Sequence, residues 1–463
     1  MTYDVAIIGG GMGGLFAAYR LTMLNPQTKI IIIEKGSDLS QRHCPAATGK
    51  ACAHCKVCAI TSGLAGSGAF SDAKFNLGTA YGGTLGQEIG EEQATHYINQ
   101  VDRILNQHCA KDYPDIFHSN QELKLECLQH DLQLLDMNVR HLGTDRNAAT
   151  MANLIQFLRM RGIAFMTHSA ASHIVQDQNK DYAIFIRQGS YVKAKKVIIA
   201  TGRGGANFVK QVCKDFNISA EANAVDIGVR VEMKDAIWEK FSSKIYEPKI
   251  LYKTRTFEDI CRMFCFNQGG IVSAENNHGI ITANGHSFAD PAKKTDNCNF
   301  AILSSVHFTE PFDEPTEYAE SVSRMANMIG NGNVIVQRFG DLIRGRRTTD
   351  NRLDRNTVRP TLKATAGDIS LVLPHRILTN IIETIYALNA VAPGTANDDT
   401  LLYGCESKYY SLKPHHNENF EIHPGIYLIG DGSGVTRGLS QSAAMGLYVA
   451  EKIVTESSHE KSE

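Results

Sequence analysis

Apolar positions near the N-terminus of the chain follow two different periods. Residues 5–8 are continuously apolar, which is typical of a buried parallel strand. From Leu15 to Leu24 the apolar residues recur at helical spacing, and Asn25 and Pro26 end the helix. A second apolar run, residues 30–33, follows. The pattern predicts a strand, a turn, a helix and a second strand.

The predicted turn carries glycines at a recognisable spacing. Gly9, Gly11 and Gly14 fill the glycine positions of GxGxxG. The first glycine permits a tight turn, the second lets the backbone approach a pyrophosphate, and the third lets helix and strand pack closely. Glu34 follows the second strand, where a carboxylate accepts hydrogen bonds from ribose hydroxyls and disfavours a 2'-phosphate. We predict a dinucleotide site formed by Gly9, Gly11, Gly13, Gly14, Glu34 and Lys35.

Two segments much further along the chain bear on which dinucleotide binds. Residues 196–202 form an apolar run that ends in Ala-Thr-Gly, and residues 425–432 contain one that ends in Gly-Asp. Both resemble fingerprints of the glutathione-reductase-type flavoproteins, whose aspartate binds the ribityl chain. The resemblance implies FAD rather than NAD, bound by Thr201, Gly202, Gly430 and Asp431.

Two further stretches have the composition expected beside a flavin ring. Residues 61–74 are mostly glycines, small residues and hydroxyls, which permit close backbone approach to a flat ligand. Residues 436–447 begin a helix whose N-terminus can stabilise the negative charge of reduced flavin. These stretches add Gly66, Ala69, Ser71, Gly438, Leu439 and Ser440 to the cofactor residues. Lys74 and Lys408 are candidates for polarising groups near the ring or the substrate.

The remaining patterns indicate further helices and strands. Helices are predicted at 88–106, 121–135, 148–161, 207–216, 318–329 and 376–388. Strands at 164–168, 171–175, 182–187 and 191–193 lead into the Ala-Thr-Gly strand and indicate a three-stranded meander. Strands at 227–231, 262–266, 279–283 and 301–308 indicate a second domain.

The resemblance and these elements together predict an α/β fold. We expect a glutathione-reductase-type FAD-binding Rossmann domain, with a parallel sheet plus the meander, and an inserted α+β substrate domain. The FAD domain comprises 1–215, with a helical insertion at 87–161, and 412–463; the substrate domain is 216–411.

Two segments of the second domain look superficially like ligand sites. The sequence Gly-Asn-Gly-Asn at 330–333 has no helix with a third glycine and no ribose acid after it, so we interpret it as a turn. Residues 338–359 contain seven arginines, but Asp341, Asp350 and Asp354 lie among them. This mixture favours paired, solvated charges over a polyanion site.

Composition places the chain among globular proteins. With 463 residues and 43% hydrophobic residues it can form two or three domains. A net charge of -2 and a pI near 6.8 provide no general attraction to nucleic acid or anionic membranes. The apolar runs are too short to span a membrane, and we expect a cytoplasmic protein without a signal peptide.

Four of the eleven cysteines are clustered. Cys44, Cys52, Cys55 and Cys58 are spaced C-x7-C-x2-C-x2-C. Such steps can direct several thiolates around one centre, as in iron–sulfur and zinc loops. Four interpretations stay open: an iron–sulfur cluster, zinc, a thiol–disulfide relay to the flavin, and thiols without a ligand. The other seven cysteines are interpreted as core residues.

Motifs over nearly the whole chain resemble a family of FAD-dependent dehydrogenases known mostly as uncharacterised proteins. They lie at 42–45, 52–58, 66–72, 226–232, 262–265, 340–346, 406–411 and 430–432. The chain departs from the family at Ala73, often a glycine, and at 267–270, where Asn-Gln-Gly-Gly replaces Cys-Pro-Gly-Gly. The resemblance implies an FAD-dependent oxidoreductase that moves hydride or electrons between flavin and an organic substrate.

Two other functions stay open. The chain is alternatively a C=C reductase fed by a ferredoxin-like donor through the cysteine cluster, or a flavin-bearing nucleic-acid or scaffold protein that uses its arginines. No second GxGxxG lies between residues 210 and 400, so we expect NADH and NADPH to reduce the flavin slowly or not at all.

Overall fold

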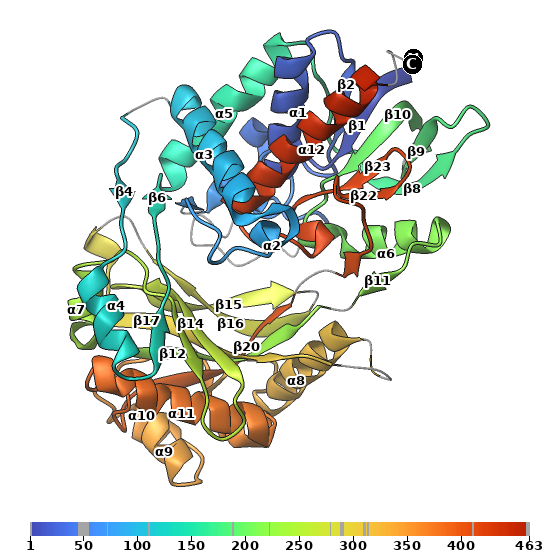
Figure 1. The fold of residues 1–463 in the computed structure, drawn as a ribbon. Helices are drawn as coiled ribbons and strands as arrows, with labels where there is room; N and C mark the ends of the chain where they lie inside the picture. The colour runs from blue at the N-terminus through green and yellow to red at the C-terminus, as the bar shows by residue number, and fades with distance from the viewer. Residues whose placement is uncertain are drawn as a thin grey trace. The chain divides into compact units, whose positions relative to one another are not determined.

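The structure is a computed structural model that describes residues 2–44, 55–71, 73–109, 112–187, 189–221, 223–277, 279–287, 291–308, 312, 314–409 and 412–459. The chain forms two compact units, and Figure 1 labels most of their helices and many of their strands. The first unit consists of Met1–Phe117, Met137–Glu221 and Ser411–Glu463. The second unit consists of His118–Asp136 and Ala222–Tyr410.

The first unit is built on a parallel sheet. Its strand order is β23-β10-β1-β2-β7, and β22 adds an antiparallel edge. The continuous apolar runs of β1 and β2 predict this arrangement, because parallel strands are buried on both faces. The bounds are β1 Thr2–Ile8, β2 Ile30–Ile33, β7 Ala164–Met166, β10 Tyr191–Ile199, β22 Glu421–His423 and β23 Ile426–Leu428.

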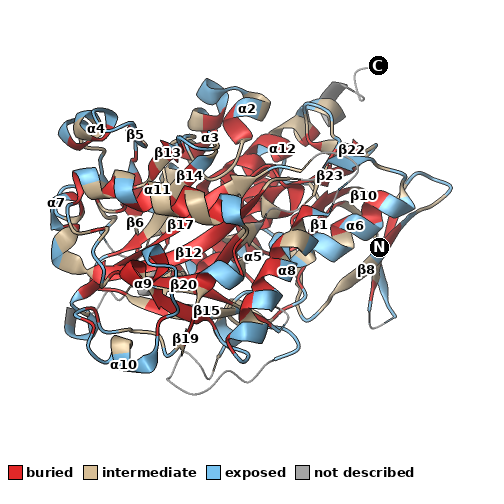
Figure 2. Ribbon diagram, turned by 90° about the horizontal axis from the view of Figure 1, so that it is seen from below, coloured by how far each residue is buried: buried red, intermediate tan, exposed pale blue. Residues whose placement is uncertain are grey.

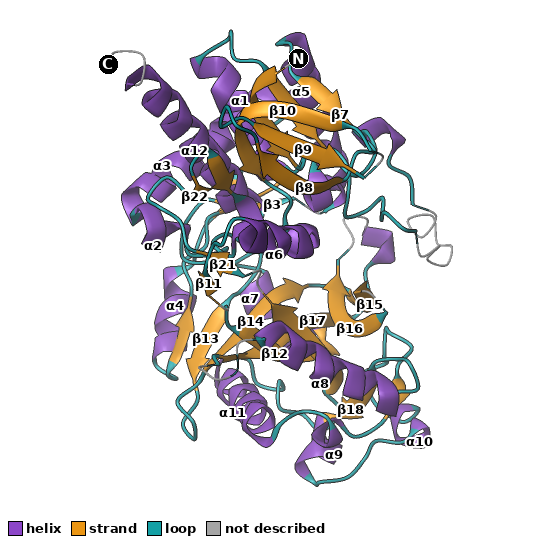
Figure 3. Cartoon of the chain, turned by 90° about the vertical axis from the view of Figure 1, so that its right-hand side faces the viewer, coloured by secondary structure: helices purple, strands orange, loops and turns teal. Residues whose placement is uncertain are grey.

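Two helices of the first unit pack closely on each other. They are α1 (Met12–Leu24), which follows β1, and α12 (Leu439–His459), near the C-terminus. A Cβ added to Gly446 would lie 2.3 Å from the carbonyl oxygen of Gly13, so the two backbones nearly touch. Figure 3 shows both helices with the sheet of this unit. The unit also contains α2 (Leu85–Ile89), α3 (Glu91–His108), α5 (Thr144–Met160) and a small sheet of β3 (Lys74–Asn76), β6 (Val139–His141) and β4 (Ile116–Phe117).

The predicted meander is present with different strand ends. The strands β8 (Ala171–Gln176), β9 (Tyr182–Ile186) and β10 pair antiparallel in that order. The strand predicted at 164–168 belongs instead to the parallel sheet, beside β2. The segment predicted as two strands, 191–193 and 196–199, is the single strand β10, which serves both the meander and the parallel sheet. Helix α6 (Ala206–Asp215) follows, and β11 (Ala220–Glu221) pairs with β21 (Lys413–Pro414).

The second unit is built on an antiparallel sheet with the order β19-β18-β20-β12-β17-β14-β13-β5. Only the β18–β19 pair is parallel among the pairings of this sheet that the structure describes. Its central strands β20, β12 and β17 are mostly red in Figure 2, because nearly all of their described residues are buried. The bounds are β5 Leu132–Leu134, β12 Val225–Lys234, β13 Ile250–Lys253, β14 Ile260–Asn267, β17 Asn297–Val306, β18 Ile335–Arg338, β19 Thr365–Ala366 and β20 Leu401–Tyr409.

Helices and a hairpin complete the second unit. Residues of α8 (Pro315–Ile329) and α11 (His375–Val391) share one apolar core with the sheet. The hairpin of β15 (Ile271–Asn277) and β16 (Ile280–His286) forms its own two-stranded sheet. The unit also contains α4 (Gln121–Leu128), α7 (Glu239–Ser242), α9 (Phe339–Ile343) and α10 (Asp350–Leu353).

The predicted helical insertion at 87–161 differs from the structure. The helix predicted at 121–135 stops at Leu128, and β5 follows and pairs with β13. The helix stops because the spacing of the apolar residues changes there. Leu132 and Leu134 are buried and Gln133 is exposed, which is the alternation of a strand. The insertion also contains β4 and β6, and its residues 118–136 cluster with the second unit.

Two simpler expectations can be compared with the structure. Residues 330–333 form a turn after α8, as predicted, with positive φ at Asn331 and Gly332. In the part of the chain that the structure describes, we find no helix with the length and apolar character needed to cross a membrane.

Candidate functional site

The glycine turn between β1 and α1 is shaped by close backbone contacts. Gly9 has φ +109°, and a Cβ there would lie 2.4 Å from the carbonyl oxygen of Ala200. A Cβ on Gly14 would lie 2.1 Å from the carbonyl oxygen of Gly9. Neither position has room for a side chain. Gly13 has a different role, because its α-carbon faces Ser442 of α12 and permits the helix contact.

Gly11 differs from the other glycines of the turn. It is the N-cap of α1 with φ -79°, a conformation open to any residue. A Cβ there would have a single neighbour within 4 Å, the α-carbon of Gly66 at 3.9 Å. Among the described residues no side chain caps α1, and the first turn of this helix carries no acidic residue. The positive end of the helix dipole therefore faces open space bounded by glycine, which suits an anionic group.

The structure brings the three predicted fingerprints together in the first unit. Gly9 packs on Ala200 and Thr201, at the end of β10. A Cβ on Gly432 would lie 3.0 Å from the carbonyl oxygen of Gly202, which joins the Gly-Asp segment to the Ala-Thr-Gly segment. Gly430, with φ +72°, packs on Ser442 of α12.

Glu34 follows β2 and is almost fully buried. Its Oε2 accepts a hydrogen bond from the Gly10 amide at 2.8 Å. Its Oε1 accepts from the amides of Gly36 at 2.8 Å and Gly63 at 3.0 Å. The carboxylate thus ties the glycine turn to the segment 61–74, a structural role that sequence analysis did not predict. The adjacent Lys35 is exposed, and its Nζ donates to the carbonyl of Gly204.

The pKa of Asp431 is influenced by two arginines that sequence analysis did not select. Burial raises the pKa of the Asp431 carboxyl, and the charges of Arg203 and Arg437 oppose this shift. Its Oδ1 accepts from the Thr436 hydroxyl at 3.2 Å and from the Gly438 amide at 3.3 Å. Arg203 directly follows the Ala-Thr-Gly motif, and that position is the one signal that points to it.

Arg42 holds the segment 61–74 together with the two residues before it. The guanidinium of this buried residue donates to four backbone carbonyls, those of Ala59, Ile60, Leu64 and Gly66, at 2.7–2.8 Å. It also lies 4.7 Å from the centre of the Phe70 ring. Burial lowers the pKa of Arg42 to about 10, a shift that the Glu34 charge opposes. In the sequence analysis Arg42 appears only as part of a motif of the family that the chain resembles. Nothing in the spacing of the sequence predicts that its guanidinium binds these four carbonyls.

Within that segment the predicted cofactor residues have local partners. Ala69 is buried, and its carbonyl accepts from the Asn147 amide group at 3.2 Å. The Ser71 hydroxyl donates to the Gly68 carbonyl at 2.8 Å. Leu439, at the start of α12, packs against Gly68, so the loop and the helix N-terminus are adjacent.

The residues of the first unit fit FAD by two independent observations. At Gly202 and Gly438, both with positive φ, an added Cβ would meet nothing within 4 Å. These glycines, like Gly11, border open space into which backbone groups are exposed. The buried hydroxyls of Thr201 and Ser440 have no hydrogen-bond partner among the described residues. Such unpaired hydroxyls require a polar partner, which a dinucleotide with many oxygens provides.

The two predicted catalytic lysines belong to different units. Lys74 begins β3, is half-buried, and pairs in register with His141 of β6. Lys408 lies on β20, and its Nζ is 3.5 Å from a carboxylate oxygen of both Glu275 and Glu406. Their catalytic role stays a prediction.

The described residues do not support the predicted metal site. Cys44 is partly exposed, and Cys55 and Cys58 are exposed; none of the three forms a disulfide in the described structure. Within the ranges described above, no group of three or more metal-ligating side chains could hold an ion. Cys52 lies outside the described residues. The pKa of the Cys58 thiol is lowered. Burial alone raises it, but hydrogen bonds from the amides of Thr61 and Ile60 and the charge of Arg42 outweigh burial.

The arginines at 338–359 are largely bound within the second unit. Asp341 is fully buried and pairs with Arg338, Arg346 and Arg352. Arg344 pairs with Asp398 at 2.8 Å. This arrangement agrees with the interpretation as paired charges, and it disfavours the nucleic-acid alternative.

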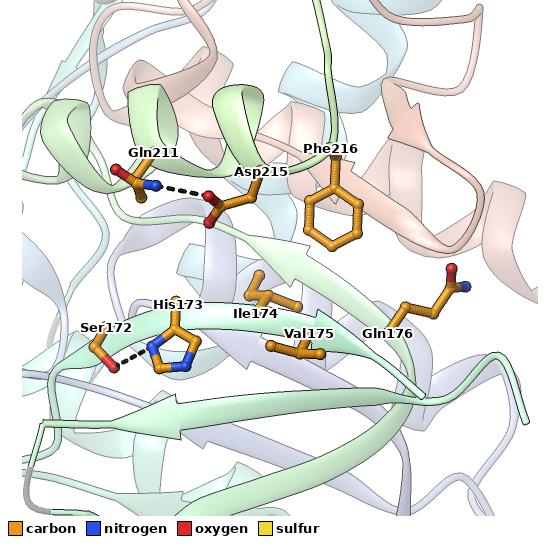
Figure 4. Close-up of a pocket in the computed structure, with 8 residues that line it drawn as sticks. All are labelled: Ser172, His173, Ile174, Val175, Gln176, Gln211, Asp215 and Phe216. Carbon is orange, nitrogen blue, oxygen red and sulfur yellow. Dashed lines mark hydrogen bonds between the residues drawn. The ribbon is translucent and has the colours of Figure 1, made fainter. Parts of the chain in front are cut away.

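A separate pocket lies between β8 and α6 of the first unit (Figure 4). Two internal hydrogen bonds occur among its lining residues, Gln211 to Asp215 at 2.6 Å and Ser172 with His173 at 3.0 Å. None of the predicted cofactor residues lines this pocket.

Two family models match the sequence. Residues 224–409 match the family described as FAD-dependent protein, C-terminal domain-like. Residues 7–50 match the NAD(P)-binding Rossmann-like domain. An uncharacterized protein of Clostridium beijerinckii is 23% identical, with 97% of this chain and 80% of that protein covered.

The comparison with solved structures finds, among others, a dehydrogenase and an oxidase at low identity. L-proline dehydrogenase from P. horikoshii has 10% identity and a TM-score of 0.41, covering 98% of this chain and 94% of its own. Glycine oxidase from Geobacillus kaustophilus has 12% identity and a TM-score of 0.39, covering 98% and 95%. At these TM-scores the likeness adds no argument about chemistry.

One family match lies in each unit, and the residues of the first unit fit the FAD that the description of the match at 224–409 names. The protein is an FAD-dependent oxidoreductase with a Rossmann-like α/β domain.

Proposed function

We propose that the chain is a glutathione-reductase-type flavoenzyme that oxidises or reduces a small organic molecule. One observation carries the proposal. Three segments that are distant in sequence meet in the first unit. They bring together the N-terminus of α1, glycines that have open space beside them, and buried hydroxyls that have no hydrogen-bond partner among the described residues. FAD, when bound there, supplies an acceptor or donor of a hydride or of single electrons.

Each part of the dinucleotide has a candidate partner in the chain. The amides at the N-terminus of α1, beside Gly11, suit the pyrophosphate. Glu34 suits the adenosine ribose, because its Oε2 accepts from one amide only and can accept a second hydrogen bond. Asp431 suits the ribityl hydroxyls, and the N-terminus of α12 at Gly438, Leu439 and Ser440 suits the electron-rich edge of the ring.

Cofactor binding and substrate binding are assigned to different units. The first unit, with boundaries near 1–215 and 412–463, holds the cofactor, and the inserted segment at 216–411 binds the substrate. No second dinucleotide motif lies in the inserted segment, so the physiological electron partner is a molecule other than a nicotinamide.

The test is the flavin content and redox behaviour of the purified protein. We expect one FAD per chain, released by denaturation and identified by chromatography, with FMN absent. Dithionite should bleach the flavin absorption, whereas NADH and NADPH should leave it nearly unchanged over minutes. A protein that purifies without flavin and does not bind added FAD would refute the proposal.

A further inference from the structure

One face of the large sheet in the second unit is polar although it is buried. On β12, apolar residues that face the core shared with α8 and α11 alternate with the charged residues Asp226, Arg230 and Glu232. Directly opposite Asp226 lie Ser305 of β17 and Lys408 of β20. Residues opposite each other in an antiparallel pair share a face, so these side chains belong to one polar surface.

Asp226 fixes an arginine at the edge of this surface. The carboxylate is 1% exposed, accepts from the Ser305 hydroxyl at 2.6 Å, and forms an ion pair with Arg262 of β14. The Arg262 side chain remains 32% exposed. Its Nε has no hydrogen-bond partner in the described structure, although this atom is buried. The guanidinium is therefore fixed by one carboxylate, while the exposed part of the side chain remains accessible to a ligand.

Lys408 is held beside Asp226 in a similar way. Its Nζ lies 3.5 Å from oxygens of Glu275 and Glu406, longer than the usual charge-assisted hydrogen bond. An ammonium has three donors, so it can bind a closer acceptor. Glu406 is fully buried and lies 3.6 Å from Arg230, which is fully buried too. The carboxylates of Glu275 and Glu406 thus position the Lys408 ammonium without using all of its hydrogen-bond donors.

We propose that Arg262 and Lys408 form an anion-binding subsite for the substrate, and that the substrate carries a carboxylate. The planar guanidinium matches the two oxygens of a carboxylate, and both cations flank the same buried Asp226. Phe264 is half-buried and lies two residues beyond Arg262 on the same face of β14, where it can contact the carbon skeleton. The inference deepens the proposed function, on which it rests, by naming the substrate class.

The charge balance favours one negative charge over two. Three cations of this surface, Arg230, Arg262 and Lys408, lie with four carboxylates, those of Asp226, Glu232, Glu275 and Glu406. A monoanion adds one further negative charge to this set, whereas a phosphate dianion adds two. We therefore assign a carboxylate rather than a phosphate ester.

Calorimetric binding to the FAD-loaded protein tests the subsite with benzoate, its neutral analogue benzamide, and inorganic phosphate, all at matched ionic strength. We expect saturable binding of benzoate that exceeds the binding of benzamide and phosphate. Arg262→Gln can still donate to Asp226, so its fold should persist, yet benzoate affinity should fall about 10- to 100-fold with the loss of a charged donor. Lys408→Gln should lower the benzoate affinity too, and it provides a second, independent test.

Arg376→Gln is the matched control. Arg376 of α11 pairs with Asp259 at 2.6 Å in the same unit, and its side chain is 61% exposed. Its replacement should leave benzoate affinity unchanged. Absence of benzoate binding, equal binding of benzamide or phosphate, or unchanged affinity in both Arg262→Gln and Lys408→Gln would overturn the inference. Flavin content is measured first on every sample: full flavin with no benzoate binding refutes the subsite alone, whereas absent flavin refutes the proposed function.

Discussion

The two large sheets present their polar groups in opposite ways. In the first unit the parallel strands are apolar on both faces, and the groups that fit the cofactor are backbone amides and glycines beyond the strand ends. In the second unit the antiparallel strands carry charged side chains along one face, with Asp226, Arg230 and Glu406 almost fully buried.

This difference determines what a sequence reveals. A site made of backbone requires glycine at fixed, short spacing, because a Cβ would collide or fill the ligand's place. A site made of side chains draws single residues from several strands, and no short motif records it. The first kind of site can be read from sequence, whereas the second requires the strand register.

The largest effect is expected where the second sheet carries its buried charges. Arg230→Met should destabilise the second unit by about 3 kcal/mol, because Glu406 loses its fully buried partner and keeps only Lys408, 3.5 Å away, as a counter-charge. Urea unfolding followed by circular dichroism measures the loss. The double variant Arg230→Met/Glu406→Gln should recover much of it; failure to recover would show that the arginine acts by packing alone.

In the first unit, Asp431→Asn removes a charge without changing shape. We expect FAD affinity to fall about 10- to 100-fold, since a charged hydrogen-bond acceptor for the ribityl chain is lost. Equilibrium titration of the apoprotein with FAD measures it. Unchanged affinity would mean that Asp431 does not contact the cofactor.

The same variant gives a pH-dependent effect in the apoprotein. The folded-state pKa of Asp431 is raised by burial, so the native protein holds this proton more tightly than the unfolded chain. That contribution to stability is present below the ordinary pKa of 3.8 and is lost as pH rises through the folded-state value. Asp431→Asn should therefore be more stable than the wild type at neutral pH, and the difference should shrink in acid. Thermal unfolding across pH detects the trend; a difference that grows in acid would contradict it.

The smallest effect is expected at the clustered cysteines. Cys55→Ser should leave flavin content and turnover unchanged, because Cys44, Cys55 and Cys58 form no metal-binding group in the structure. Elemental analysis and the visible spectrum check this. A loss of iron or zinc together with activity would restore the predicted metal site.

The elements predicted best from the sequence are those with one clear period. The strand-turn-helix-strand unit, the turn at 330–333 and the helices at 318–329 and 376–388 all occur with nearly the expected ends. The helix predicted at 121–135 was wrong at its end because β5 is three residues long, too short for its alternation to outweigh the preceding helix. The role of β7 depends on its pairing with β2, which a local pattern does not contain.

The candidate sites divide in the same way. Glycines 9, 11 and 14 and Asp431 were selected by motif, and the structure places them in one unit. Arg42 was not assigned a role, because its four carbonyl partners belong to a loop whose path no spacing predicts. Arg262 and Ser305 were not selected either, because they meet Asp226 only through strand pairing.

The central claim, a cofactor site made of backbone, is tested most directly by bound FAD per chain in Gly11→Val, with Gly78→Val as control. Gly11 has an ordinary φ and open space around its Cβ, and Gly78 has open space too, so both variants should fold. We predict that Gly11→Val purifies folded but without flavin, because its side chain fills the pyrophosphate position. Gly78→Val should retain one FAD per chain. Full flavin occupancy in folded Gly11→Val would contradict the claim.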